Sequence, residues 1–180
     1  MSELKRVEKC VIVGASGKDI GKTTLITNII RHIKSISDDK IYGIKSTIFH
    51  GDAKFDNYSI LKEDNMSGKT DTSRMLLSGC EEVYWLKTDM ESVEKGFLEI
   101  LEKIPLESII ICESNTLRNF VIPDLFILLA DEDQTNWKKS ALNILDKADL
   151  VINIDRNSEL NLPEVSTFLT LDKTKFSLIG

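Results

Sequence analysis

The chain has 180 residues, of which 42% are hydrophobic and 29% are charged, and its formal net charge is −6. This size and composition predict one globular domain, residues 1–180, with a full hydrophobic core. The negative charge and the lack of a dense basic run argue against a nucleic acid or an anionic membrane as partner. The first residues lack an apolar signal region and no apolar stretch is as long as a membrane span, so we expect a cytoplasmic protein.

Six apolar runs recur along the chain, with helical patterns between most of them; the runs are 10–13, 41–49, 83–86, 109–112, 125–129 and 150–154. Several are continuous rather than alternating, as in parallel strands that are covered on both faces. Strands that alternate with helices imply right-handed crossovers. The pattern therefore predicts an α/β fold, a doubly wound and mainly parallel sheet flanked by helices.

Several segments have the pattern of helices. The run 25–33 places four isoleucines on one helical face, namely Ile26, Ile29, Ile30 and Ile33. Thr88 and Glu91 have the spacing of a capping box before a helical pattern that continues to Pro105. Residues 134–147 and a short segment after Pro163 are further predicted helices.

Between the first predicted strand and the first predicted helix lies a glycine-rich turn, which reads G-A-S-G-K-D-I-G-K-T-T from Gly14 to Thr24. It is a variant of the phosphate-binding P-loop G-x-x-x-x-G-K-[ST], with Ser16 at the place of the first glycine. Glycines let backbone N–H groups surround an anion, and the helix that follows points its positive end at the same spot. We expect a nucleoside triphosphate to be held by Ser16, Gly17, Lys18, Asp19, Ile20, Gly21, Lys22, Thr23 and Thr24.

Within this loop two residues have distinct predicted roles. Lys22 supplies a positive charge for the outer phosphates, and the hydroxyl of Thr23 is placed to ligate Mg²⁺. Glu113 ends the buried run 109–112, where a carboxylate can hold Mg²⁺ or its water. Asp71 is either a second acid of the site or the N-cap of a helix. We therefore predict Lys22, Glu113 and Asp71 as catalytic residues, and Thr23, Glu113 and Asp71 as metal ligands.

Lys45 lies among apolar neighbours in the second predicted strand. Such a lysine either binds an anion, a phosphate or a substrate carboxylate, or extends its amine to solvent. For a guanine base we looked for N-K-x-D after the strand at 149–152, and only Asn153 fits that pattern. Asp155 could contact the base at altered spacing. Lys45, Asn153 and Asp155 are therefore further candidates for nucleotide binding.

Residues 51–70 form a long, mainly polar stretch directly after the second predicted strand. We expect a mobile loop above the same sheet edge as the P-loop. It is either a nucleotide-sensing or partner-binding loop, or an insertion without function.

Taken together, these features resemble MobB, the small P-loop adaptor of molybdopterin-guanine dinucleotide biosynthesis, in the SIMIBI class. The similarity lies in the stretches 14–25, 43–45, 68–74, 79–80 and 109–113. Glu113-Ser114-Asn115 and the stretches 123–126 and 148–153 are also similar to metallocentre-assembly GTPases of urease and hydrogenase. The chain departs from these families at Ser46, where MobB has a histidine, and at Gly17, where the SIMIBI class has a lysine.

The resemblance implies that the protein binds GTP or ATP with Mg²⁺, with GTP favoured, and hydrolyses it slowly in the assembly of a molybdenum–pterin or related metal cofactor. It implies a molybdopterin-handling protein as partner and leaves a homodimer open, with Lys18 next to the place of the SIMIBI lysine. Two alternatives stay open. One is an ATP-dependent ligase or kinase for a small carboxylated substrate, similar to dethiobiotin synthetase. The other is a nucleotide-responsive adaptor that does not hydrolyse its nucleotide.

Overall fold

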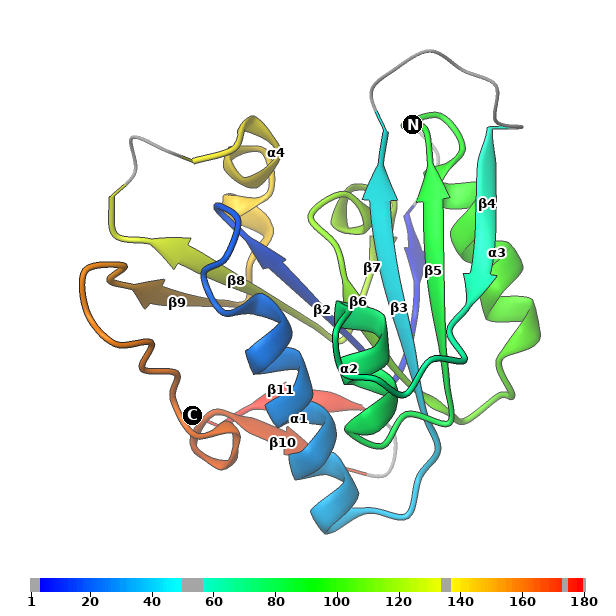
Figure 1. The fold of residues 1–180 in the computed structure, drawn as a ribbon, viewed down its shortest axis with the longest axis horizontal. Helices are drawn as coiled ribbons and strands as arrows, with labels where there is room; N and C mark the ends of the chain where they lie inside the picture. The colour runs from blue at the N-terminus through cyan, green and yellow to red at the C-terminus, as the bar shows by residue number, and fades with distance from the viewer. Residues whose placement is uncertain (1–3, 50–56, 134–136, 173–174, 180) are drawn as a thin grey trace.

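A seven-stranded sheet forms the centre of the computed structural model, which describes residues 4–49, 57–133, 137–172 and 175–179 (Figure 1). Its strand order is β4-β5-β3-β6-β2-β8-β9, and every neighbouring pair is parallel except β4 with β5. The strands are β2 (Cys10–Ala15), β3 (Ile41–Ile48), β4 (Tyr58–Lys62), β5 (Glu82–Thr88), β6 (Ile109–Glu113), β8 (Leu125–Asp131) and β9 (Leu150–Ile154).

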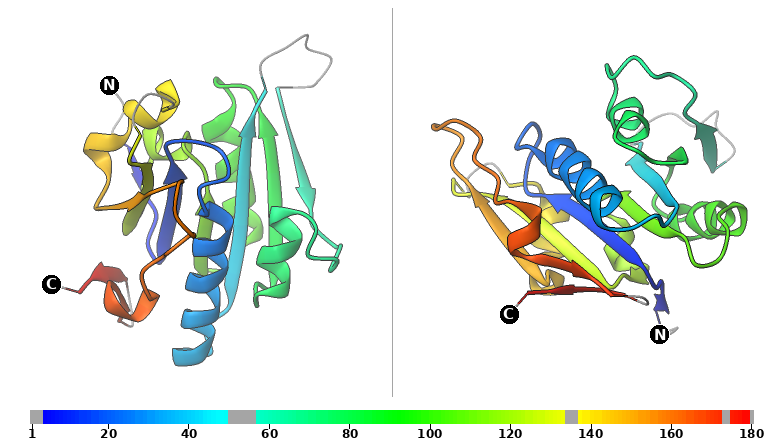
Figure 2. Two further views of the ribbon diagram at one scale, coloured as in Figure 1. Left: turned by 60° about the vertical axis from the view of Figure 1, so that its left-hand side comes forward. Right: turned by 90° about the horizontal axis from the view of Figure 1, so that it is seen from below.

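Helices cover both faces of this sheet. Figure 2 shows α1 (Lys22–Ile36) and α2 (Asp71–Leu77) on one side and α3 (Val93–Lys103) on the other. Alternate residues of the central strand β2 enter two different cores: Val11 and Val13 pack on the α1 side, whereas Cys10 and Ile12 pack on the α3 side. Because both faces are buried, the strand reads as a continuous apolar run. The α/β class and the two-sided arrangement of helices are therefore confirmed.

Shorter elements complete the fold. Two small sheets pair β1 (Lys5–Arg6) with β7 (Val121–Ile122) and β10 (Leu169–Leu171) with β11 (Phe176–Leu178). The described residues also contain one short α-helix and three 3₁₀ turns: α4 (Lys139–Leu142), η1 (Leu117–Asn119), η3 (Leu145–Lys147) and η4 (Val165–Thr167). In the described ranges, no helix combines the length and the apolar character needed to cross a membrane.

Three local predictions are wrong. The helix predicted at 134–147 is not formed: residues 137–147 hold only the short elements α4 and η3, and residues 134–136 lie outside the described residues. The segment after Pro163 forms the 3₁₀ turn η4 rather than a helix. Thr88 does not begin a capping box, since it ends β5 and its hydroxyl donates to the carbonyl of Asp89. The helix starts five residues later, where the N–H of Ser92 donates to Oδ1 of Asp89.

The expected loop at 51–70 contains a strand. Tyr58 and Ile60 of β4 pair with Thr88 and Leu86 of β5 and pack against the α3-side core. Because β4 runs antiparallel to β5, the chain turns back from the carboxyl edge of the sheet and then reaches α2 through residues 63–70. The part of the predicted loop at 51–56 lies outside the described residues.

Candidate functional site

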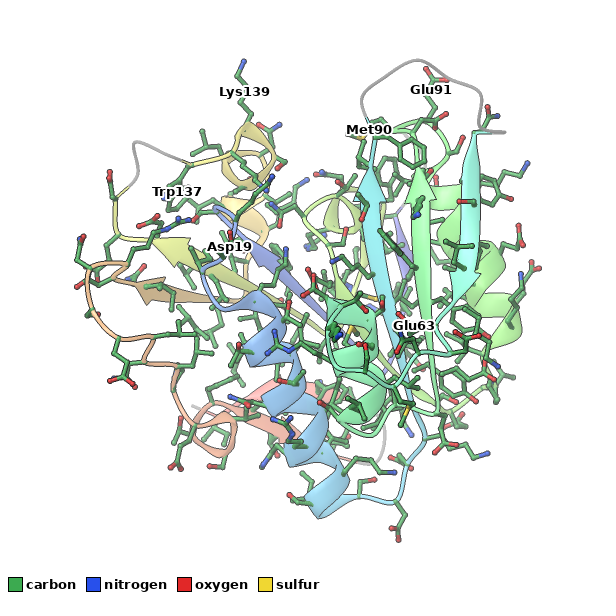
Figure 3. The ribbon with its side chains drawn as sticks, viewed as in Figure 1. Asp19, Glu63, Met90, Glu91, Trp137 and Lys139 are labelled. Carbon is green, nitrogen blue, oxygen red and sulfur yellow. The ribbon has the colours of Figure 1, made fainter. Side chains whose placement is uncertain are left out.

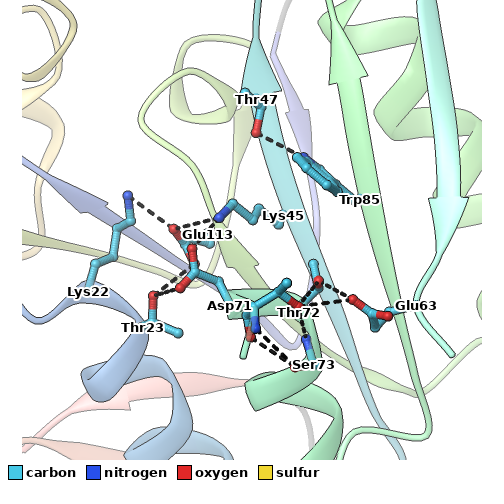
Figure 4. A network of polar contacts seen from close by, with 11 residues as sticks. Lys22, Thr23, Lys45, Thr47, Glu63, Asp71, Thr72, Ser73, Trp85 and Glu113 are labelled. Carbon is cyan, nitrogen blue, oxygen red and sulfur yellow. Dashed lines mark hydrogen bonds and ion pairs between the residues drawn. The ribbon is translucent and has the colours of Figure 1, made fainter. Parts of the chain in front are cut away.

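The candidate site lies at the carboxyl ends of the central strands β2, β3 and β6 (Figure 4). In open α/β sheets this is the edge at which ligands bind. The loop 16–21 follows β2 directly and leads into α1. Val13 of β2 is in register with Glu113 of β6, and Glu113 is in register with Lys45 of β3. The topology therefore brings the loop, an acid and a lysine to one place.

The backbone of the loop has free hydrogen-bond donors. None of the eight N–H groups from Gly17 to Thr24 donates a hydrogen bond to a partner within the described ranges. Gly21, the N-cap of α1, has a φ of 92° and provides no side-chain cap. Asp19 also has a positive φ, 58°, and lies at the turn between β2 and α1 (Figure 3). Free N–H groups beside the positive end of a helix are features of an anion site.

The first residues of α1 contact two acids. Nζ of Lys22 lies 3.2 Å from Oε1 of Glu113, which is a buried carboxylate. The hydroxyl of Thr23 donates a 2.9 Å hydrogen bond to Oδ1 of Asp71 and lies 3.4 Å from Oε2 of Glu113. The residues predicted as catalytic or metal-binding, Lys22, Thr23, Asp71 and Glu113, are therefore neighbours in space although they come from α1, α2 and β6.

Lys45 belongs to the same cluster. Its ammonium forms an ion pair with Asp71 and lies 3.9 Å from Oε1 of Glu113. Burial favours a higher pKa for Asp71, but hydrogen bonds from Lys45 and Thr23 and the positive charges of Lys45 and Lys22 outweigh it and lower the pKa below its ordinary value. Two lysines thus face two carboxylates, so the cluster is electrically balanced in the absence of a ligand.

Asp71 is available to this cluster because a different residue caps its helix. Thr70 is the N-cap of α2: its hydroxyl accepts from the N–H of Ser73, and the hydroxyl of Ser73 accepts from the N–H of Thr70, both at 3.2 Å. Glu63 accepts a hydrogen bond from the hydroxyl of Thr72, the main cause of its lowered pKa. The alternative that Asp71 is the N-cap is wrong, and its carboxylate is directed at Thr23.

Asn115 holds the start of the loop, a role that was not predicted. Its side-chain amide accepts from the N–H of Ala15 and donates to the carbonyl of the same residue, both at 2.8 Å. The hydroxyl of Ser16 accepts from the N–H of Asp131 at 2.8 Å, and the carbonyl of Ser16 accepts from the N–H of Lys138 at 2.9 Å. The side chain of Ser16 therefore anchors the loop to the end of β8. The sequence signals for Asn115 were its place two residues after Glu113 and the similarity of Glu113-Ser114-Asn115 to metallocentre-assembly GTPases.

Arg156 lies against the loop and was also not predicted. Its guanidinium donates to the carbonyl of Lys18 at 2.8 Å and pairs with the buried Asp131, with Nε 2.5 Å from Oδ2. A Cβ atom at Gly17 would lie 2.4 Å from Nη2 of Arg156, so glycine permits this close approach. Ile20 is buried in the α1-side core, and the hydroxyl of Thr24 accepts from Arg74 at 3.3 Å.

The predicted base-binding residues do not join the cluster. Asn153 lies in β9 between Ile152 and Ile154, which pack into the α1-side core, so its exposed side chain points to the opposite face. Asp155 is exposed and accepts from the N–H of Asn157 at 2.8 Å. Among the described residues, no hydrogen bond or ion pair joins Asn153 or Asp155 to the loop.

The donor set suits a metal ion that keeps several water ligands. Within the described part of the chain, no group of three or more His, Cys, Asp or Glu side chains is placed to hold a metal. One hydroxyl and two carboxylates, from Thr23, Asp71 and Glu113, form a smaller set of oxygen donors. Mg²⁺ is commonly bound in this way, by one or two carboxylates together with substrate phosphates and water. Two surface hollows of about 690 and 680 Å³ lie elsewhere, beside α3.

Comparisons of the chain with protein-family models, with curated proteins and with solved structures gave no match. The functional argument therefore depends on the geometry and chemistry of the residues themselves.

Proposed function

We propose that the protein binds a nucleoside triphosphate together with Mg²⁺ at the loop between β2 and α1, and hydrolyses it slowly. One observation carries this proposal: Lys22, Thr23, Asp71 and Glu113 meet directly beside a run of free backbone N–H groups. Free donors and a lysine suit phosphate oxygens, and the neighbouring oxygen donors suit Mg²⁺.

Each group has a defined part in this proposal. The N–H groups of residues 17–24 would hold the β- and γ-phosphates, and Lys22 would neutralise charge that develops on the γ-phosphate. Thr23, Asp71 and Glu113 would hold Mg²⁺, which supplies positive charge for the phosphate oxygens. Slow turnover is an expectation that comes from the sequence resemblance.

The sequence resemblance adds the identity of the nucleotide and the process to this proposal. It favours GTP over ATP, and a role in assembly of a molybdenum–pterin or related metal cofactor with a molybdopterin-handling partner. These parts depend on the sequence alone. Addition of such a carrier protein to the hydrolysis assay, with GTP and with ATP, tests them separately from nucleotide binding.

Isothermal titration calorimetry with GTP and ATP, with and without Mg²⁺, tests the proposal directly. Thermal unfolding is a second measurement. At a nucleotide concentration near a hundred times Kd, the Tm should rise by about 5–10 °C. Lys22→Ala should remove this rise, whereas Lys34→Ala, an exposed lysine in the last turn of the same helix, should keep it. The proposal fails if neither nucleotide releases or absorbs heat on titration. Tight binding without any hydrolysis would favour the adaptor alternative.

A further inference from the structure

A row of side chains crosses the sheet in register from β4 to β2. Its members are Leu61, Trp85, Lys45, Glu113 and Val13. Residues in register on neighbouring strands point to the same face, and neighbouring strands are about 4.8 Å apart. Trp85 is therefore two strands, roughly 10 Å, from Glu113 on the same face of the sheet. Trp85 and the cluster around Glu113 therefore lie on the same face of the sheet.

A second row lies nearer to the carboxyl ends of the strands on this face, where Thr47, Lys87 and Ser59 are in register. Helix α2 covers only the lower part of the face, where Met75 packs over Gly43 and Val83. On β5 the residues of this face change from buried at Val83 to half-buried at Trp85 and Lys87. Among the described residues, the side chains on the upper part of the face are therefore partly exposed beside the candidate nucleotide site.

The indole ring of Trp85 is held between polar groups in this accessible region (Figure 4). Its Nε1–H donates a 2.9 Å hydrogen bond to the hydroxyl of Thr47. Nζ of Lys87 lies 4.0 Å from the ring centroid, and Nζ of Lys45 lies 6.0 Å from it. Among the carboxylates of the described residues, none forms an ion pair with Lys87.

We propose that Lys45, Thr47, Trp85 and Lys87 form a binding site for a planar small molecule that carries a carboxylate or a phosphate group. The ring supplies flat apolar contact, the two ammonium groups supply charge complementary to an anion, and the hydroxyl of Thr47 can still donate a hydrogen bond. The site's position next to a triphosphate rests on the proposed function, but its preference for a planar anion does not.

Lys45 belongs both to this site and to the cluster around Asp71 and Glu113. In the structure its ammonium is occupied by Asp71 and Glu113. With those carboxylates engaged as ligands of Mg²⁺, the ammonium of Lys45 becomes available to an anion over Trp85. Binding of the planar anion should therefore tighten, by about threefold to tenfold, in the presence of Mg²⁺ and nucleotide.

The test uses the indole N–H signals in the NMR spectrum of the ¹⁵N-labelled protein. The chain has two tryptophans, and the spectrum of Trp85→Phe identifies which signal belongs to Trp85. The probe is 2-naphthoate, titrated without nucleotide. We expect it to shift the Trp85 signal and to bind about fivefold or more tightly than 2-naphthalenemethanol, which lacks the charge, and cyclohexanecarboxylate, which lacks the planar ring. Equal affinity for the alcohol, or no shift of the Trp85 signal, would overturn the proposal.

Variants assign the effect to the site. Lys87→Gln and Trp85→Leu should each weaken 2-naphthoate binding by about fivefold or more. Lys95→Gln is the matched control, because Nζ of Lys95 in α3 lies 5.7 Å from the ring centroid of Tyr58 in β4. This variant should keep wild-type affinity. Unchanged affinity in Lys87→Gln, with its other amide signals retained, would also overturn the proposal.

The titration is repeated with Mg²⁺ and a non-hydrolysable GTP analogue, and nucleotide binding is measured separately by calorimetry. Naphthoate binding without nucleotide binding would defeat the proposed function and leave the planar-anion site intact. Nucleotide binding without naphthoate binding would defeat the planar-anion site alone.

Discussion

The hydroxyl of Thr23 donates a 2.9 Å hydrogen bond to the carboxylate of Asp71, which lies 48 residues later in the chain. Thr23 is in the first turn of α1 and Asp71 begins α2, so the N-termini of two helices meet at this bond. The N-terminus of a helix favours negative charge. The meeting point therefore favours the carboxylate form of Asp71, whose pKa is lowered.

The lowered pKa of Asp71 predicts a specific dependence of stability on pH. In the unfolded chain the Asp71 carboxylate takes up a proton near its ordinary pKa of 3.8, and in the folded protein it does so only at a lower pH. The contribution of ionised Asp71 to the free energy of unfolding is thus complete above pH 3.8. It is lost as the pH falls through the pKa of Asp71 in the folded protein. Asp71→Asn should lower the free energy of unfolding at neutral pH by about 1 kcal/mol, a figure reduced for partial exposure to solvent.

Urea unfolding at a series of pH values checks this prediction. The difference in unfolding free energy between wild type and Asp71→Asn should shrink as the pH falls below 3.8. The exposed Asp38, changed to asparagine, serves as the control and should show little difference at any pH. A difference for Asp71→Asn that stays constant down to strong acid would contradict the assignment.

Glu113→Gln should separate metal binding from nucleotide binding. The amide keeps the shape of the buried side chain but removes the charge that faces Lys22 and Lys45. The enhancement of nucleotide affinity by Mg²⁺ is the ratio of the affinities measured by calorimetry in Mg²⁺ and in EDTA. We expect this enhancement to be about tenfold or more smaller in the variant than in wild type. Glu94→Gln, on the exposed face of α3, should respond to Mg²⁺ as wild type does. A full Mg²⁺ response in Glu113→Gln would show that the carboxylate is not a ligand.

Asn115→Ala should destabilise the protein through the loop backbone. It removes the acceptor for the N–H of the buried Ala15 and the donor to its carbonyl. An unpaired buried backbone group costs about 1–3 kcal/mol, so we expect a loss of that size in chemical unfolding. Asn161→Ala, at an exposed position, is the comparison. If both variants unfold at the same urea concentration, Asn115 does not support the loop.

The cysteines should be unreactive in the native protein. Burial raises the pKa of Cys80 to about 12, so at pH 8 about one thiol in ten thousand is ionised. A hydrogen bond with Cys112 and then burial raise the pKa of Cys10. Iodoacetamide should therefore label the cysteines only when the protein unfolds, as measured by mass spectrometry. Mg²⁺ with nucleotide should slow this labelling. Fast labelling of a single site under native conditions would contradict the buried placement.

Some elements were predictable because local sequence alone specifies them. The strand around Ile12 and Val13 is apolar on both faces, and the spacing from Gly14 to Thr23 identifies the loop without knowledge of the fold. The strand β4 was missed because only Tyr58 and Ile60 of its five residues face the core, within a polar stretch. Two inward residues are too few to produce a recognisable alternation.

The same distinction applies to the site. Lys22 and Thr23 could be assigned from their places in one loop, and Glu113 from its place at the end of a buried run. For Asp71 the sequence left two roles open, an acid of the site or a helix N-cap, because the choice depends on Thr70 as the helix cap and on the packing of α2 against α1. The contacts of Asn115 and Arg156 with the loop depend on strands far away in the chain, so no local pattern could predict them.

The bonds of this cluster span 48, 90 and 100 positions of the chain, for Thr23 with Asp71, Thr23 with Glu113, and Ala15 with Asn115. During synthesis on the ribosome, the loop between β2 and α1 emerges long before the strand that completes its surroundings. A ligand that needs the whole cluster thus has no target on the nascent chain. Ligand binding would consequently report that the central sheet has finished folding.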